Sequence, residues 1–337
     1  MAVRHVTLAD VAALSGVSTA TASRVLAGIG RPQPPTRDRV LAAARELNYR
    51  PSGVARALKR RETRTLGLLV TDITNPFYPQ IVRAVEAAAH ARGYGIVLAN
   101  GGDDAARELE HLELLVERRV DGIVIASSLM TRRHAERLHR TAVPMVLVND
   151  TVAGSRLPTV TTAHRRGARL ATEHVIGLGH RRIGHIGAPA DQAASGHRRR
   201  GVRDALRAAG LGEPLVAIGD GGVVGGANAT EALIGSDVTG IVAYNDLSAI
   251  GALRALRRAG IGVPEAVSVV GFDDIDLAAW TDPPLTTIRQ PTDALGRWAV
   301  EHLADLLAGH AVDDAAAPVL LEPELVVRGS TAAQGGE

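Results

Sequence analysis

The sequence predicts a small all-α helix-turn-helix headpiece, followed by an α/β body of two lobes, each a twisted parallel sheet with helices on both faces. Three observations support this fold class. The first 64 residues are basic and the rest are acidic; two short helices flank a glycine near the amino terminus; and apolar runs alternate with amphipathic stretches in two similar series. A chain of 337 residues is long enough for two or three domains.

The composition limits the possible classes of protein. No Cys is present, so disulfides and cysteine metal sites are excluded, and 46% hydrophobic residues are enough for a packed core. No signal-peptide pattern precedes Asp10, and no segment approaches the roughly 20 apolar residues of a membrane helix. We therefore expect a cytoplasmic protein without a membrane partner, a cofactor or a metal.

The charge is unevenly distributed. Residues 1–64 hold 12 basic and 4 acidic residues, a net charge of +8, whereas the remainder holds 26 basic and 32 acidic residues, a net charge of −6. A basic amino-terminal part on an acidic body indicates a polyanion partner for that part alone. An ordinary solvated basic surface explains the charge equally well, so further signals are needed.

Two short helices open the chain. Thr7 is placed to cap a helix over 8–14, Gly16 suits a tight turn with positive φ, and Ser18 is placed to cap a second helix over 19–26. This spacing is typical of a helix-turn-helix. A shared small core is expected from Leu8, Val11, Ala12, Val17, Ala22 and Val25.

The second helix has an outer face of short, polar or basic side chains, suited to base edges in a major groove: Thr19, Ala20, Ser23 and Arg24. A third helix is expected from about Thr36 to about Asn48, with an apolar stripe of Leu41, Ala44 and Leu47. An ordinary three-helix bundle without a DNA role is the alternative.

A basic linker follows the third helix. Pro51 ends that helix, and Ser52 is placed to cap a further helix reaching Leu58. Two turns of helix are too short to persist alone in water, so this segment is expected to order only against a partner. Its basic side chains favour DNA as that partner: Arg56, Lys59, Arg60 and Arg61.

In the body, apolar runs alternate with amphipathic stretches, a pattern typical of parallel sheets flanked by helices. The first lobe is expected to contain buried strands over 66–70, 96–99, 122–126 and 145–148, with helices such as 80–92 and 108–119 between them. The second lobe repeats the pattern with strands over 182–186, 215–218, 241–244 and 267–272.

Polar and aromatic residues follow these strands, where parallel sheets bind ligands. The polar ones are Asp72, Asn75, Ser127, Ser128, Asn149, Asn245, Asp246, Asp273 and Asp274. Five of the eight aromatic residues lie in or beside the same turns: Phe77, Tyr78, Tyr244, Phe272 and Trp280. Amides and carboxylates beside aromatic faces suit a polyhydroxylated ligand. The alternative for each Asp or Asn is a helix cap or an Asx-turn.

A series of motifs resembles the lactose-repressor/galactose-repressor (LacI/GalR) family over residues 6–331. The headpiece carries Thr7-Leu8-Ala9-Asp10-Val11-Ala12, Gly16-Val17-Ser18, Ser23-Arg24-Val25-Leu26 and Asn48-Tyr49-Arg50-Pro51, followed by a hinge-like Ala55-Arg56-Ala57-Leu58. The body carries Asn75-Pro76-Phe77-Tyr78, Gly177-Leu178-Gly179-His180-Arg181-Arg182-Ile183, Asn245-Asp246, Gly271-Phe272-Asp273-Asp274, Pro283-Pro284-Leu285-Thr286-Thr287-Ile288 and Val327-Arg328-Gly329-Ser330-Thr331.

The resemblance implies a domain organisation. It implies a headpiece at 1–50, a hinge at 51–63, an effector-binding domain at 64–331 and a disordered tail at 332–337. The first lobe would comprise 64–162 and 290–318, and the second lobe 163–289 and 319–331. In the family, two hinge helices pair in the DNA minor groove, where a leucine matching Leu58 opens a base step, as apolar wedges do.

The resemblance also implies two sets of site residues. The set expected at DNA is Thr7, Ser18, Thr19, Ala20, Ser23, Arg24, Tyr49, Ser52, Ala55, Arg56 and Leu58. The set expected at the effector is Asp72, Asn75, Phe77, Tyr78, Ser127, Asn149, Arg198, Asn245, Asp273 and Gln290. Arg198 would donate paired hydrogen bonds and Asp273 would accept from hydroxyl groups.

Four departures from the family pattern stand out. Ser52 replaces the usual Asn, and Pro32-Gln33 replaces a common Val-Ser before the third helix. Ala163-His164 replaces an Asp-Asn pair, and Gly221-Gly222 stands where an aromatic or hydroxyl side chain often holds the ligand. The last two leave the identity of the effector open.

The predicted function is a homodimeric, effector-responsive repressor of carbohydrate genes, binding a palindromic operator and a sugar or related polyol. A periplasmic-type sugar-binding transport protein shares the body, but needs a signal peptide and would not need residues 1–61. A sugar-modifying enzyme is a third class; the sequence lacks a His-Glu-x-x-His, Walker or nucleophile-elbow motif. We therefore do not expect an enzyme.

Overall fold

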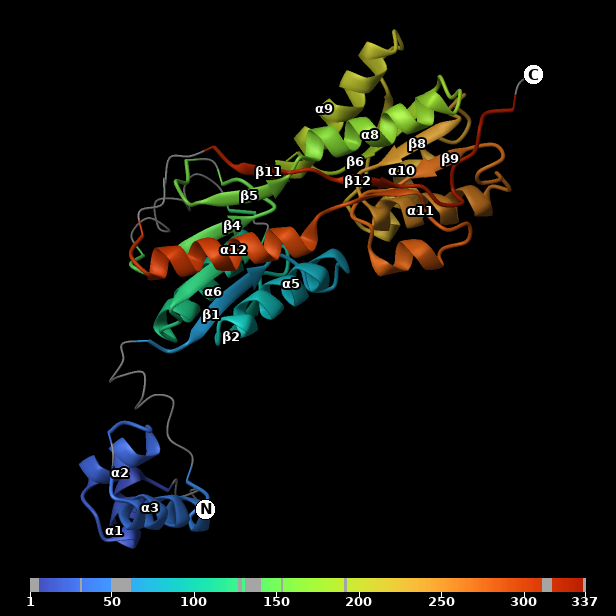
Figure 1. The fold of residues 1–337 in the computed structure, drawn as a ribbon. Helices are drawn as coiled ribbons and strands as arrows, with labels where there is room; N and C mark the ends of the chain where they lie inside the picture. The colour runs from blue at the N-terminus through green and yellow to red at the C-terminus, as the bar shows by residue number, and fades with distance from the viewer. Residues whose placement is uncertain are drawn as a thin grey trace. The chain divides into compact units, whose positions relative to one another are not determined.

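The computed structural model describes residues 6–30, 32–49, 62–126, 129–130, 141–152, 154–190, 193–310 and 317–335. The chain divides into two compact units, Met1–Arg64 and Thr65–Glu337, called here the head and the body (Figure 1). Each unit is described by itself. Among the described residues, no helix combines the length and the apolar character needed to cross a membrane.

The head contains α1 (Leu8–Ser15), α2 (Thr19–Leu26) and α3 (Pro34–Glu46). Thr7 caps α1 in a reciprocal arrangement: its Oγ1 accepts from the Asp10 N–H, and its backbone N–H donates to the Asp10 carboxylate. Gly16 ends α1 at φ +68°, and the Ser18 hydroxyl accepts from the backbone of α2. The predicted caps and turn are confirmed.

The third helix differs from its prediction in two respects. It begins at Pro34 rather than near Thr36, because proline suits the first turn of a helix, where no N–H is needed. Its buried side chains are Val40, Ala43 and Ala44, so of the predicted stripe only Ala44 is fully buried. The head core consists of Val11, Ala12, Ala22, Val25, Val40, Ala43 and Ala44.

The first lobe of the body is a six-stranded parallel sheet in the order β11-β5-β4-β3-β1-β2. Its strands are β1 (Thr65–Val70), β2 (Gly95–Asn100), β3 (Gly122–Ala126), β4 (Met145–Val148), β5 (Thr159–Thr162) and β11 (Val319–Leu321). Its helices are α5 (Phe77–Ala91), α6 (Ala105–Glu117) and α12 (Thr292–Leu307). Leu66 and Leu68 of β1 pack in the core that includes α5 and α12, and Leu69 packs in the core that includes α6.

The second lobe is a four-stranded parallel sheet in the order β7-β6-β8-β9. Its strands are β6 (Ile183–Gly187), β7 (Leu215–Ile218), β8 (Gly240–Ala243) and β9 (Ser268–Val270). Its helices are α8 (His164–Gly177), α9 (Ala193–Ala208), α10 (Val223–Glu231), α11 (Asp246–Arg258) and the 3-10 helix η1 (Asp276–Trp280). Helices cover both faces, and the two-lobed fold class is confirmed (Figure 1).

The chain crosses between the lobes three times. It passes from β5 into α8, from β10 (Thr287–Arg289) into α12, and from β11 into β12 (Glu324–Val326). β10 and β12 pair antiparallel at the crossing. β11 pairs with β5 of the first lobe, so the last crossing lies after Leu321. The boundary before residue 319, which the resemblance implies, is therefore wrong.

Two further expectations are wrong. β2 and β7 are not buried, because they lie at the edges of their sheets, where Leu98 is 43% and Ile218 is 56% exposed. The tail is ordered beyond residue 331, since the Ala332 N–H donates to Ser268 and the Gln334 N–H donates to the Leu178 carbonyl.

Candidate functional site

The head presents the predicted base-reading face. Thr19, Ala20 and Arg24 on α2 are exposed, and Ser23 is half-buried beside them. Because Ser18 caps this helix with its side chain and Ala22 and Val25 turn inward, the outward direction of the face is fixed.

The other residues predicted to lie at DNA fall into three groups. Thr7 and Ser18 are exposed residues at the amino-terminal ends of α1 and α2. Tyr49 is half-buried and packs on the head core. The hinge positions Ser52, Ala55, Arg56 and Leu58 lie outside the described residues, as does Ser127 of the effector set. The DNA contacts of all these residues stay predictions.

The body holds a cavity of about 350 Å³ between its lobes. All nine described residues of the predicted effector set line it: Asp72, Asn75, Phe77, Tyr78, Asn149, Arg198, Asn245, Asp273 and Gln290. They come from turns after β1, β4, β8, β9 and β10, from the first turn of α5 and from α9. We call this cavity the effector pocket; contact of its residues with a ligand stays a prediction.

Further residues line the effector pocket that the sequence had not singled out as site residues. The charged ones are Asp103, Asp150 and Asp220. Tyr244, which the sequence places beside a strand end but not in the effector set, adds an aromatic face. Asp103 follows β2 and Asp150 follows β4. The expectation that polar residues after parallel strands bind ligands, which identified Asp72, therefore applies to them as well. Trp280 does not line the pocket and is 86% exposed.

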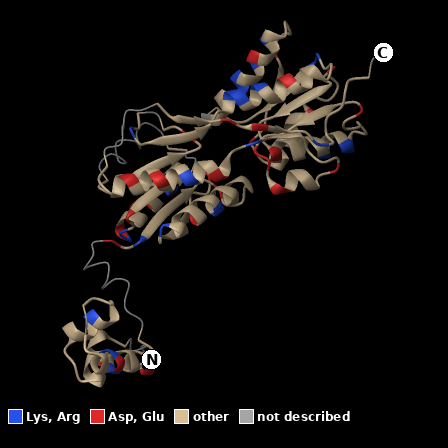
Figure 2. Cartoon of the chain, in the orientation of Figure 1, with Lys and Arg blue, Asp and Glu red and all other residues tan. Residues whose placement is uncertain are grey.

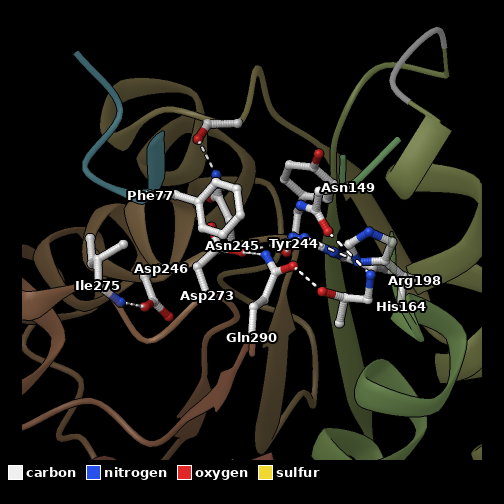
Figure 3. A network of polar contacts seen from close by, with 12 residues as sticks. Phe77, Asn149, His164, Arg198, Tyr244, Asn245, Asp246, Asp273, Ile275 and Gln290 are labelled. Atoms are coloured by element: carbon white, nitrogen blue, oxygen red, sulfur yellow. Dashed lines mark hydrogen bonds and ion pairs between the residues drawn. The ribbon is translucent and has the colours of Figure 1, made fainter. Parts of the chain in front are cut away.

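Arg198 is the central cation of the pocket and is 4% exposed. Its Nη1 donates to the Tyr244 carbonyl at 2.5 Å and its Nη2 donates to Asp273 Oδ1 at 3.3 Å (Figure 3). The guanidinium lies over the Phe272 ring, 3.7 Å from its centroid. These contacts fix the guanidinium plane, and its Nε has no hydrogen-bond partner among the described residues.

Asp273 is connected to the crossing between the lobes. Gln290 Nε2 donates to Asp273 Oδ1 at 2.7 Å, and Gln290 Oε1 accepts from the Thr162 hydroxyl at 2.6 Å. Thr162 ends β5 and Gln290 follows β10, so the chain of hydrogen bonds spans two of the three crossings. A ligand on Asp273 would therefore contact a hydrogen-bond network that includes two of the segments joining the lobes.

Several predicted ligand residues also hold local turns. Asn245 Oδ1 caps α11 and its Nδ2 donates to the Gly221 carbonyl. Asn75 Oδ1 accepts from the Phe77 N–H, and the Asp72 carboxylate accepts from Thr74. These are the cap and Asx-turn roles that the sequence left open; each oxygen keeps a further lone pair for a ligand.

Burial sets the ionisation of the pocket. Burial raises the pKa of Asp273 to about 6, although Arg198 and Gln290 stabilise its charged form. Burial and the Asp273 charge raise the pKa of Asp246 well above its usual value. Burial, Arg198 and His197 lower the pKa of His164 well below its usual value, against the opposing effect of the Asn149 backbone. No cluster of metal-binding side chains occurs among the described residues.

Comparisons with known proteins agree with this architecture. Residues 7–52 match the model of bacterial regulatory proteins, lacI family, and residues 172–331 match the periplasmic binding protein-like domain. An uncharacterised HTH-type transcriptional regulator of Streptomyces limosus is 42% identical, over 96% of this chain and 94% of its own length. The chain belongs to the lacI family of bacterial regulatory proteins. It is accordingly a DNA-binding transcriptional regulator.

Other lacI-family members are similar over nearly the whole chain. The ribose operon repressor of Escherichia coli (strain K12) is 36% identical, over 96% of this chain and 99% of its own length. The crystal structure of the lac repressor dimer bound to operator and an anti-inducer has a TM-score of 0.89 at 30% identity, covering 98% of this chain and 100% of its own. A complex of the transcriptional regulator CelR with cellobiose has a TM-score of 0.72 at 36% identity, covering 97% and 100%.

Proposed function

We propose that this lacI-family regulator is a homodimeric repressor that binds a palindromic operator and changes its operator affinity when an uncharged sugar or related polyol occupies the effector pocket. The observation that carries the proposal is the buried Arg198–Asp273–Gln290 network, which offers donors and acceptors in one fixed constellation. Relatives whose names or titles refer to ribose, cellobiose or operator DNA support it.

The charges of the pocket favour an uncharged ligand rich in hydroxyl groups. Among the described residues, five aspartates line it against one arginine: Asp72, Asp103, Asp150, Asp220 and Asp273. Carboxylates accept hydrogen bonds from hydroxyl groups and repel phosphate or carboxylate groups. Phe77, Tyr78 and Tyr244 supply the apolar faces on which the C–H side of a sugar ring can lie.

The dimer has support from one exposed surface. Trp280 is 86% and Leu277 is 51% exposed, and both belong to the 3-10 helix η1. Exposed large apolar side chains mark interaction surfaces. We further infer that residues 51–63, most of which lie outside the described residues, act as the hinge of this regulator.

The test uses the full chain. Ribose, glucose, maltose and cellobiose are screened by thermal shift, and the sugar with the largest stabilisation is titrated into a complex of the protein with an operator selected from randomised palindromes. We expect one sugar to change operator affinity by about 5- to 150-fold, the usual range of such coupling. If none of the sugars stabilises the protein or alters DNA binding, the proposed effector class is wrong.

Arg24→Ala tests base reading by α2. Arg24 is exposed on the outer face, and a base contact by arginine is worth about 1–3 kcal/mol of discrimination. We expect operator affinity to fall by that amount while affinity for unrelated DNA stays nearly constant, measured by fluorescence anisotropy at fixed salt. Arg37→Ala, at an exposed arginine of α3, is the control. An equal loss on both DNAs would contradict base reading.

The pKa of Asp273 predicts how sugar affinity depends on pH. The carboxyl group accepts hydrogen bonds from hydroxyl groups most strongly when ionised, and its pKa is about 6. Affinity should therefore be constant above about pH 7 and fall below pH 6, by up to about tenfold per pH unit. Calorimetric titration of wild type and Asp273→Asn checks this, since the variant should have a flatter profile. A profile that is the same in both proteins would assign the pH dependence to another group.

A further inference from the structure

A second cavity, of about 610 Å³, lies beside the effector pocket. One side comes from the first lobe, with Thr161, Thr162 and Leu320, and the other from α8 and α9 of the second lobe, with Arg166 and His197. Only Asn149, Asp150 and Ala194 line both cavities, and neither Arg198 nor Asp273 lines the second one. It is therefore a neighbouring space between the lobes, with a largely different lining.

The second-lobe side of this cavity is rich in hydrogen-bond donors. It includes the first turn of the 14-residue α8, whose cap residue Ala163 has no side chain to accept from the free N–H groups. Arg165 is paired with Asp204, and Arg169 with Glu173, but Arg166 has no ion-pair partner among the described residues. Figure 2 shows basic residues gathered on α8 and α9, all of them arginines.

His164, the first residue of α8, adds a buried donor. It lines the cavity and is 6% exposed. Its Nδ1 lies 3.4 Å from Arg198 Nη2, which can only donate, so Nδ1 accepts and the proton of the neutral ring is on Nε2 (Figure 3). This Nε2 has no hydrogen-bond partner among the described residues. The Asn149 backbone interacts with this ring and raises its pKa, but no acceptor in hydrogen-bonding geometry to Nε2 is present among the described residues, so a ligand group can supply one.

The pKa shifts of titratable groups indicate a positive potential on the second-lobe side of the cavity. Burial, Arg200 and Arg165 lower the pKa of His197. Arg165 lowers the pKa of Asp204 by a hydrogen bond and by its charge, and Arg207 and Arg169 add to this effect against desolvation. Asp150 and Glu322 line the opposite side and would keep an anionic group near the arginines, where the acidic Asp204 is already paired with Arg165.

We propose that this cavity is a second effector site, which binds a small organic anion with one carboxylate or phosphate group directed at the first turn of α8 and at Arg166. The apolar lining, from Ala163, Pro318 and Leu320, takes the body of the molecule. This site goes beyond the proposed sugar effector, because the aspartates of the effector pocket disfavour a ligand that carries a negative charge.

The two cavities are coupled through one side chain. Arg198 Nη2 is within hydrogen-bonding distance of both His164 Nδ1 and Asp273 Oδ1. An anion that accepts a hydrogen bond from His164 changes the position of the guanidinium that binds Asp273. Binding at the second cavity therefore changes sugar affinity in the first, and sugar changes anion affinity by the same factor.

The test is calorimetric titration of the full chain with benzoate, phenyl phosphate and the uncharged benzamide. We expect at least one of the two anions to bind with unit stoichiometry and benzamide to bind at least about tenfold more weakly, since charge-assisted hydrogen bonds are the stronger ones. The two anions separate a carboxylate site from a phosphate site. Arg166→Gln should weaken anion binding about tenfold, whereas Arg254→Gln, an exposed arginine of α11 outside the cavity, should not.

Asp273→Asn locates the anion. This variant should retain the anion while losing the sugar, so failure of the sugar proposal would leave this one testable. Loss of anion binding in Asp273→Asn would place the anion in the effector pocket and overturn the proposal. So would equal binding of benzamide, or no binding of either anion. With sugar bound, anion affinity should shift at least about threefold; an unchanged value would overturn the coupling.

Discussion

Asp273→Asn is expected to weaken binding of the sugar by about 2–5 kcal/mol above pH 7, where the wild-type carboxylate is ionised. Asp273 is 5% exposed, and its carboxylate accepts from Arg198 and Gln290. The amide of the variant keeps the shape but leaves the Arg198 charge without its counter-ion in a buried site. Calorimetric titration, with the sugar identified by thermal shift, measures the loss.

Asp276→Asn provides the matched control for this prediction. Asp276 lies three residues away on η1 and is exposed, so the same change of charge should leave sugar affinity within error. If Asp273→Asn binds the sugar as tightly as wild type does, Asp273 is not a ligand residue, and its hydrogen bonds to Arg198 and Gln290 are structural only.

Gly201→Ala is expected to destabilise the body by about 2–3 kcal/mol. Gly201 lies on α9 where this helix crosses α8, and a Cβ there would come 2.2 Å from the Arg165 carbonyl oxygen and 2.9 Å from the Ala168 Cβ. The helices must separate, because backbone cannot yield as a side chain does. Since Arg198 is on the same helix, sugar affinity should fall as well. Urea unfolding and calorimetric titration measure the two effects.

Gly212→Ala is the control for Gly201→Ala. A Cβ at Gly212 meets no atom within 4 Å, and its φ is not positive. The same substitution should therefore change the free energy of unfolding by less than about 0.5 kcal/mol. Equal stabilities of the two variants would show that α8 and α9 can move apart without cost.

The effector pocket could be predicted from the sequence because it follows from topology. Asp72, Asn149 and Asp273 are far apart in sequence, but each follows a strand of a parallel sheet. The carboxyl ends of such strands meet along one edge, so apolar runs ending in polar residues locate the site without any knowledge of side-chain contacts.

The short strands at the crossing could not be predicted in the same way. β10, β11 and β12 have three residues each, and such runs do not differ from loops by periodicity. They exist because the chain passes between lobes there and pairs with segments more than 30 residues away. The role of His164 at the wall between two cavities likewise depends on tertiary contacts with Arg198 and Phe272.

The separate cores of head and body have a consequence for how such regulators diversify. None of the seven buried side chains of the head core belongs to a core cluster of the body. Substitutions on the outer face of α2 therefore need no compensating change around Arg198, and new lining residues in either cavity need none in the head. Operator choice and ligand choice can evolve as independent traits, and exchange of whole heads between relatives should give chimeras that keep the ligand of one parent and the operator of the other.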